Sequence, residues 1–356
     1  MARALPVLWT VVLAVGMLVG GFTVGYSVSR LSSPSANGPA TSTLSVIAAG
    51  TLGVPFGSIA SYVANTSDGV SAPTAAQQYE GSLLVMSAVA QLGGSFDVVA
   101  AADYRLIPAN LEPDWTSWEV VFATSPEALV YDPTVAALDG MNTSNWPSKV
   151  LASGVPMGVA NASTDPNGYN QIFVLELEGL LQNGSLSALY DHFFTTPVGS
   201  YAIPNPTTTR VESESNVASL ISSHAVGLFI TYRSYAVSHG LSYVDLDPAV
   251  GLGSTDPVNE ATYAQASTTI EPAGGTQLLH GAPVLFSVTV PHNAPDAALG
   301  LAFVHVLLSP VGGSVLSADG LTPIFPGWCD RPIAVPSILA PDVVPLPSTL
   351  SDQLAP

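Results

Sequence analysis

Short apolar runs alternate with helix-length segments along the chain after residue 43. The runs LSVIAAG and FDVVAAAD are apolar at successive positions, so each predicts a strand that is buried on both faces. Between them, residues 55–63 and the segment SLLVMSAVAQLG have the length and apolar content of helices. Strands and helices in this order are typical of a mostly parallel sheet covered by helices. We therefore predict an α/β fold.

The same alternation continues toward the C-terminus. WEVVFATSPEALVYD predicts two strands around Ser125 and Pro126, and GVPMGVAN, VGLFITYRS and PVLFSVTVP predict further strands. Helices are predicted for about residues 168–181, for residues 216–223 and for DAALGLAFVHVLLS, whereas GLTPIFPG is predicted to be a closing loop. About 290 residues of this pattern exceed one comfortable sheet, so we expect two lobes.

The N-terminal part has a different character. Residues 5–28 carry no charge and lie between Arg3 and Arg30, which predicts a signal or anchor segment over residues 1–30. Its length favours an anchor over a cleaved signal, and a buried core helix is the weaker alternative. The Ser- and Pro-rich residues 31–43 predict a flexible linker. We therefore expect the protein at the extracellular face of the cytoplasmic membrane, anchored or secreted.

Charged residues are scarce in this sequence. Lys and Arg number 7 against 26 Asp and Glu, which gives a formal net charge of -19. This balance excludes a basic nucleic-acid binder, because the phosphates of a nucleic acid could not be neutralised. The hydrophobic fraction of 47% is too high for a disordered acidic tail. A chain with so few bases gains little positive charge in acid, so the composition predicts an extracellular protein of an acidophile.

Most catalytic and metal-binding motifs are absent from the sequence. It contains no GxGxxG after a strand, no Walker loop, no HExxH and no GxSxG, and its six His residues have no ligand spacing. The single Cys329 excludes a cysteine metal site and is expected to be inert. Four sequons are compatible with a surface glycoprotein, at Asn65, Asn142, Asn161 and Asn183.

The most informative chemistry lies at the ends of predicted elements. Thr51 follows a buried strand and Ser82 begins a helix, where a hydroxyl and free N–H groups can bind an anion. Asp165 and Glu214 also lie at predicted helix starts. All four are ordinary helix-capping residue types, so capping is the alternative role of each. Carboxylates repel an anion unless its centre is a hard metal that accepts oxygen ligands.

From about residue 44 to residue 326, the sequence resembles the archaeal-type tungstate/molybdate-binding proteins of ABC importers, an extracellular solute-binding protein family. The resemblance rests on the order and spacing of short pieces. These are VIAAGTL followed by Pro55 and Phe56, EGS, FDVVAAADY, W-x-x-x-FA, NW, DPNGY, E-S-N-V, YRSYA, SVTVP and LLSPVGGSVLSADGLTPI.

The resemblance implies a two-lobed type II periplasmic-binding-protein fold. Each lobe would be a mostly parallel sheet flanked by helices, with the ligand in the interlobe cleft. In this chain, residues 44–124 and 285–334 would form lobe I and residues 125–284 lobe II. Residues 335–356 would remain as a Pro-rich tail.

The resemblance also implies a ligand set for one oxyanion, made of Thr51, Ser82, Asp165, Glu214 and Tyr232. The two carboxylates of this set would coordinate the tungsten or molybdenum directly and raise its coordination number from four to six. Glu212 is the alternative to Glu214, which we prefer because its spacing to Tyr232 fits the family.

Three positions depart from the family pattern. Thr51 stands where the family has Ser, Asn170 where it has Arg, and Phe286–Ser287 where it has a tyrosine-glycine pair. The first change keeps the hydroxyl. The other two concern the hinge and the surroundings of the ligand.

The resulting prediction is a non-enzymatic, monomeric binding protein without a cofactor. It would capture tungstate or molybdate and deliver the ion to an ABC permease and its ATPase. Three alternatives stay open: a binding protein for sulfate or phosphate, a secreted hydrolase that uses Asp165 and Glu214 as acid and base, and a surface adhesion protein. The sequence does not distinguish tungstate from molybdate.

Overall fold

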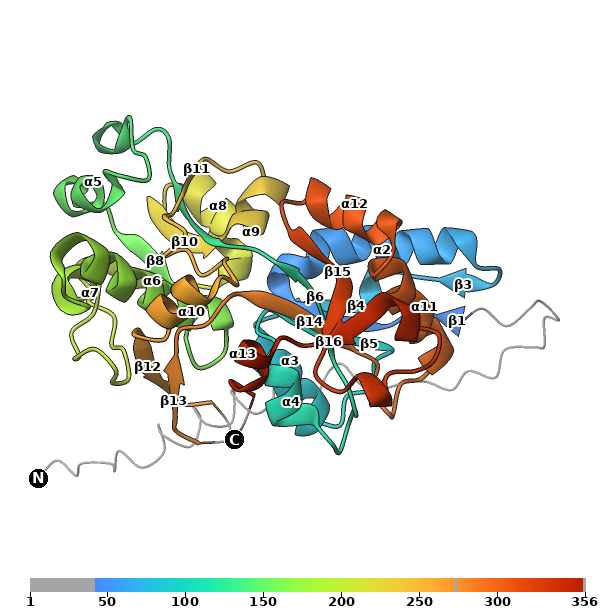
Figure 1. Ribbon diagram of the computed structural model, residues 1–356. Helices are drawn as coiled ribbons and strands as arrows, with labels where there is room; N and C mark the ends of the chain where they lie inside the picture. Colours follow the sequence, from blue (N-terminus) through green and yellow to red (C-terminus); the bar gives the residue numbers. More distant parts are fainter. Residues whose placement is uncertain (1–41, 273–274, 355–356) are drawn as a thin grey trace, which may run out of the picture. The chain divides into compact units, whose positions relative to one another are not determined.

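The computed structural model describes residues 42–272 and 275–354. The predicted signal or anchor segment and most of the predicted linker lie outside these residues. Two sheets organise the described part of the chain (Figure 1). We call the seven-stranded sheet with its helices lobe I and the five-stranded sheet with its helices lobe II.

The sheet of lobe I has the strand order β16-β15-β6-β14-β5-β2-β4. In that order its strands are Val343–Pro345, Thr322–Cys329, Val120–Thr124, Leu285–Thr289, Val98–Ala101, Val46–Ala49 and Gln77–Glu80. Strands β2, β4 and β5 run parallel to one another, whereas β14 is antiparallel to both β5 and β6. The sheet is therefore mixed and not mostly parallel.

Helices cover both faces of the sheet of lobe I. Val85, Met86 and Val89 of α3 pack with Ile47 and the helix α4 in one apolar cluster. In a second cluster, Phe56 of α2 packs edge-on against Phe303 of α11, with ring centroids 5.1 Å apart. The helices of lobe I are α2 (Gly53–Thr66), α3 (Ser82–Ala90), α4 (Leu106–Leu111), α11 (Ala297–Leu307), α12 (Pro310–Ala318) and α13 (Ser348–Ser351).

The sheet of lobe II has the order β11-β7-β10-β8-β9 and is also mixed. Its strands in that order are Tyr243–Asp245, Glu127–Tyr131, Leu228–Tyr232, Met157–Val159 and Thr209–Val211. Strand β10 is parallel to β8 and antiparallel to β7. The helices of lobe II are α5 (Trp146–Ser153), α6 (Pro166–Asn183), α7 (Ser187–Phe193), α8 (Val217–Ser222), α9 (Arg233–Ser238) and α10 (Pro257–Tyr263).

Short elements complete the fold. Two small sheets pair β1 (Ser42–Thr43) with β3 (Val70–Ser71), and β12 (Ser267–Ile270) with β13 (Gln277–His280). The 3₁₀ turns are η1 (Gly50–Leu52), η2 (Thr74–Ala76), η3 (Ala136–Leu138), η4 (Glu214–Asn216), η5 (Pro332–Ala334) and η6 (Ala340–Asp342). The chain crosses from lobe I to lobe II between β6 and β7 and returns before β14. The exact residues at which the two lobes begin and end, given above as 44–124 and 285–334 for lobe I and 125–284 for lobe II, remain a prediction.

Two features of the C-terminal region differ from the sequence pattern. GLTPIFPG was expected to be a loop, but it lies largely within strand β15, so this prediction is wrong. The pairing of β15 with β6 shifts register between Pro323 and Trp328. Pro326 lies in this interruption, where the strand needs no backbone N–H to pair with its neighbour. The Pro-rich region beyond residue 334 contributes the edge strand β16, and Leu339 and Leu350 are fully buried.

Among the described helices, none alone has the length and apolar character to cross a membrane. Of these helices, only α11 and α12 taken together have this length and composition, and they are bent by 68° relative to each other.

Several carboxyl groups are buried without a basic partner. Glu119, Glu127 and Glu176 are almost completely inaccessible, and none of them forms an ion pair within the described residues. Burial raises the pKa of Glu176 to about 8 and the pKa values of Glu119 and Glu127 well above their usual value. These groups are therefore neutral in the folded protein at acidic pH.

This burial predicts that the ligand-free protein loses stability as the pH rises. The folded-state pKa of Glu176 exceeds its usual value. Its contribution to the free energy of unfolding is therefore complete below pH 4.5 and is lost as the pH rises through about 8. We expect the melting temperature to fall between about pH 5 and pH 9, and Glu176→Gln to reduce the fall. A melting temperature that rises over this range in calorimetry would contradict the account.

Candidate functional site

The carboxyl ends of two parallel strands of lobe I carry the predicted hydroxyl residues. Strand β2 ends at Ala49 and leads into the turn that contains Thr51, and β4 ends at Glu80 just before α3 begins at Ser82. Because β2 and β4 are parallel, both turns lie at the same edge of the sheet. Ligands of α/β proteins bind at this edge.

Lobe II contacts lobe I at the same edge. A Cβ atom built on Gly81 would lie 2.4 Å from the carbonyl oxygen of Thr164 and 3.1 Å from the Cβ of Asp165. Such distances leave no room for a side chain, so glycine permits this close approach. The two lobes are therefore closed upon each other here.

An interlobe cavity of about 180 Å³ lies beside this contact. Both lobes line it, through Gly50, Tyr79, Glu80, Gly81 and Leu84 of lobe I and Asp165, Ser213, Glu214 and Ser215 of lobe II. Two of the five predicted ligand residues, Asp165 and Glu214, are in this lining. Glu212, the alternative to Glu214, is not. Neither lobe contributes a basic residue to the lining.

Asp165 is held at the N-terminus of α6. Its Oδ1 accepts a hydrogen bond of 3.0 Å from the backbone N–H of Asn167, and Pro166 occupies the first helical position, where no N–H is required. Burial raises the pKa of Asp165 to about 6. Asp165 therefore both caps α6, as predicted, and lines the cavity.

Glu214 is the more deeply buried carboxyl of the pair, with 4% of its surface exposed. Its Oε1 accepts a hydrogen bond of 3.1 Å from Thr231 Oγ1, which lies in β10. Burial, followed by the charge of Asp165, raises the pKa of Glu214 well above its usual range. The two carboxyls therefore disfavour each other's ionisation, and a positively charged centre between them would relieve this repulsion.

None of the three predicted hydroxyl ligands is in the lining of the cavity. Thr51 Oγ1 is 3.5 Å from Ser234 Oγ of lobe II. Ser82 is fully buried, and its Oγ accepts a hydrogen bond of 2.9 Å from the backbone N–H of Ala102. The structure therefore places both residues next to the interlobe contact, with Ser82 already engaged inside lobe I.

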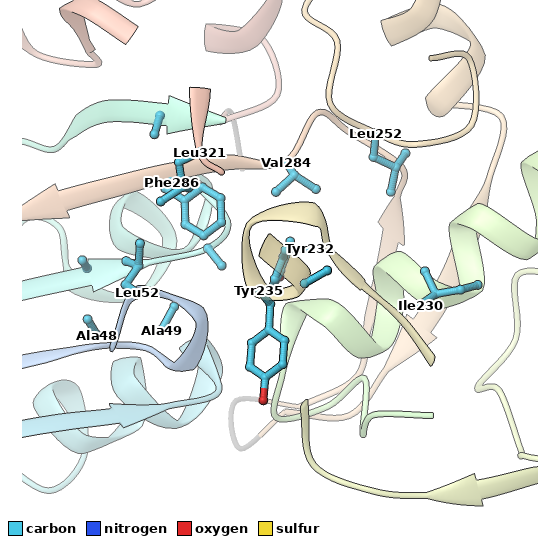
Figure 2. Close-up of a cluster of buried hydrophobic side chains, with 14 of the residues drawn as sticks. Ala48, Ala49, Leu52, Ile230, Tyr232, Tyr235, Leu252, Val284, Phe286 and Leu321 are labelled. Atoms are coloured by element: carbon cyan, nitrogen blue, oxygen red, sulfur yellow. The ribbon is translucent and has the colours of Figure 1, made fainter. Parts of the chain in front are cut away.

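Tyr232 ends strand β10 and is buried at the lobe interface. Its ring packs edge-on against Phe286, with centroids 5.5 Å apart, and Figure 2 shows both residues in an apolar cluster with Leu52 and Val284. Its hydroxyl has no hydrogen-bond partner among the described residues. A buried hydroxyl without a partner is costly and is available to a bound ligand.

Several polar residues of this region were not anticipated from the sequence. Glu127 accepts hydrogen bonds from Asn170 Nδ2 at 3.0 Å and Asn167 Nδ2 at 3.3 Å, both in α6. Asn170, one of the departures from the family pattern, thus partners a buried carboxyl. Glu127 is an acidic residue that directly begins the apolar run EALVY, and this was the signal for a buried carboxyl.

The remaining chemistry candidates have ordinary roles. Cys329 is buried and unpaired, and burial raises the pKa of its thiol to about 12. His305 of α11 is half-exposed, and its Nδ1 lies within hydrogen-bond distance of Asp342 Oδ2, 3.0 Å away. Within the described part of the chain, no group of three or more His, Cys, Asp or Glu side chains could hold a metal ion.

Comparison with known proteins gives the family. The family model described as "Bacterial extracellular solute-binding protein" matches residues 44–322, which is most of the chain. This chain belongs to that family. The predicted solute-binding class is therefore confirmed, and the hydrolase and adhesion alternatives are discarded because this family binds solutes and is non-enzymatic.

Individual solute-binding proteins show the same relationship. An uncharacterized solute-binding protein of Methanoculleus marisnigri is 30% identical over 311 residues, which cover 83% of this chain and 86% of that protein. A protein of Pyrococcus abyssi named molybdate/tungstate-binding protein WtpA is 27% identical over 303 residues, covering 80% of this chain and 87% of WtpA.

The architecture agrees with a solved solute-binding protein. The periplasmic molybdate-binding protein of Azotobacter vinelandii superposes with a TM-score of 0.54 at 14% identity, and the match covers 78% of this chain and 98% of that structure. The predicted α/β periplasmic-binding-protein fold is confirmed, with two mixed sheets flanked by helices. As a member of this family, the protein serves an ABC transporter and binds a small ligand.

Proposed function

We propose that this protein captures tungstate or molybdate outside the cell and delivers it to an ABC permease driven by its ATPase. The observation that carries the proposal is the pairing of Asp165 and Glu214 at one interlobe cavity without a basic residue in its lining. Two ionised carboxylates without a basic residue beside them would repel an oxyanion. A tungsten or molybdenum centre accepts carboxylate oxygens as ligands and turns this repulsion into binding.

The other predicted residues complete the proposed ligand set. Thr51 and Ser82 offer hydroxyls and backbone N–H groups from lobe I, and Tyr232 offers its unpartnered hydroxyl from lobe II. The names of relatives such as WtpA support the same ligand class. We further propose that the protein acts as a monomer, and that its N-terminal residues 1–30 tether it to the membrane or direct its secretion.

Sulfate or phosphate is the second candidate. Because burial raises the pKa values of Asp165 and Glu214, a protonated carboxyl could donate a hydrogen bond to the oxygen of such an anion. This binding mode would use the carboxyls as donors and would not involve the central atom. The two modes therefore differ in which anions are bound most tightly.

Isothermal titration calorimetry with the four anions tests the proposal. We expect tungstate and molybdate to bind at least about 100-fold more tightly than sulfate or phosphate, since only the metal oxyanions gain two extra ligands. The titrations are run at about pH 5 and pH 7, because the protonation states of the carboxyls change over this range. Tightest binding of sulfate or phosphate at both values would reject the assignment.

A further inference from the structure

A second set of contacts joins the two lobes away from the cavity. Tyr169 Oη of α6 donates a hydrogen bond of 2.7 Å to Asp103 Oδ2, which follows strand β5 of lobe I. Tyr169 is 1% exposed and Asp103 is 6% exposed. A hydrogen bond from a buried hydroxyl to a carboxylate is among the stronger kinds, because the acceptor is charged.

Arg105 holds the Asp103 carboxylate in place. Its Nη2 donates to Asp103 Oδ2 at 2.7 Å and its Nε to Oδ1 at 3.0 Å. The remaining nitrogen, Nη1, donates to the carbonyl oxygen of His280 in β13, 3.0 Å away. Burial alone would raise the pKa of Asp103, but Arg105 and the Tyr169 hydroxyl lower it below its usual value. The Asp103 carboxyl therefore stays ionised to a lower pH than an ordinary Asp.

One helix connects this bond to the cavity. Asp165 caps the N-terminus of α6, and Tyr169 lies four residues later, about 6 Å along the same face of the helix. The cavity carboxyl and the bonding hydroxyl therefore move together when lobe II moves. The Tyr169–Asp103 bond of 2.7 Å is lost once its atoms separate by about a further 1 Å.

We propose that Tyr169 and Asp103 form a latch that holds the lobes closed on the bound ion, with Tyr169 acting as a positioning residue. This inference rests on the proposed function, because it assumes that the ion occupies the interlobe cavity. A bond that exists only in the closed form stabilises that form selectively. It slows the escape of the ion and leaves the capture step of the open form unchanged.

The test compares two buried tyrosines in the full chain. Tyr169→Phe removes the interlobe bond. Tyr104→Phe is the matched control, because Tyr104 Oη donates to Leu350 O at 3.4 Å and Gln353 Oε1 at 3.1 Å, both within lobe I. Stopped-flow fluorescence gives the rate constants for tungstate. We expect Tyr169→Phe to raise the dissociation rate constant about tenfold or more and to change the association rate constant less than about threefold.

The control variant should dissociate at the wild-type rate. If Tyr169→Phe and Tyr104→Phe release tungstate equally fast, the latch is rejected. The melting temperature of ligand-free Tyr169→Phe should fall no further than that of Tyr104→Phe, since the bond contributes only in the closed fraction of the ligand-free protein. A large loss of ligand-free stability would instead show a purely structural bond.

Failure of the proposed function can be distinguished from failure of the latch. If the wild type does not bind tungstate, the proposed function fails, and the latch is tested from interlobe distances. Ser61 in α2 and Ser148 in α5 are exposed, one in each lobe, and can be replaced by spin-labelled cysteines while the buried Cys329 stays unreactive. Tyr169→Phe should reduce the closed fraction relative to Tyr104→Phe. Identical distance distributions would reject the latch.

Discussion

Gly81→Ala is expected to abolish tight tungstate binding while the protein stays folded. The new methyl carbon would lie 2.4 Å from the carbonyl oxygen of Thr164 across the interface, and this backbone atom cannot move aside as a flexible side chain would. The backbone of Gly81, with φ -59° and ψ 136°, suits alanine, so lobe I itself is not strained. Only the closed form is destabilised, and the dissociation constant should rise at least about 100-fold.

Gly57→Ala provides the matched control for this experiment. It adds the same methyl group to lobe I within α2, where the nearest atom beyond the helix is Gln77 Oε1 at 3.7 Å, an ordinary contact distance. Alanine also favours a helix more than glycine does. We expect wild-type affinity and equal or higher stability for Gly57→Ala. If calorimetry gives the same affinity for both variants, the lobes do not close on the ion at Gly81.

The second large effect concerns the cavity carboxyls. Glu214→Gln and Asp165→Asn keep the size of each side chain, and asparagine can still cap α6. Each change replaces a proposed carboxylate ligand of the metal with a neutral amide, which is a weaker ligand for a high-valent metal. We expect each variant to bind tungstate at least about 100-fold more weakly than the wild type. Loss of a residue that only supports a metal ligand can already cost about this much. Sulfate binding, which uses no such bond, should change far less.

Glu212→Gln serves as the control for the carboxyl variants. Glu212 lies two residues before Glu214 and is not in the cavity lining. Its replacement should leave the tungstate affinity, measured by calorimetry, near the wild-type value. Equal losses of tungstate and sulfate in Glu214→Gln would mean that the carboxyl only shapes the cavity. A larger effect of Glu212→Gln would place the ligand two residues earlier.

The apolar pattern was sufficient to predict the central strands. Strands β2, β5, β10 and β14 are buried along their whole length, so their runs of apolar residues identify them without tertiary information. Edge and interrupted strands lack this pattern. β4 has the sequence QQYE with alternating exposure, and β15 contains two prolines. The mixed strand directions depend on where the chain returns from lobe II, which no local pattern encodes.

The candidate site likewise contains residues that the local sequence predicted and contacts that it did not. Asp165 and Glu214 were identified because acidic residues at helix starts have a local pattern, and the structure brings both to one cavity. The contacts that support them join distant parts of the chain. Tyr169 and Asp103 are 66 positions apart, and Asn170 and Glu127 are 43 apart. Such partners follow from the packing of the lobes, so the sequence alone offered no means to pair them.

X-ray absorption at the tungsten edge of the wild-type complex tests the central claim most directly, because it reports the oxygen atoms around the metal. If Asp165 and Glu214 coordinate tungsten, the bound metal should have about six oxygen neighbours. Glu214→Gln, loaded with enough tungstate to bind, should then show fewer neighbours than the wild type. A wild-type spectrum identical to that of free tetrahedral tungstate would contradict direct coordination by the two carboxylates.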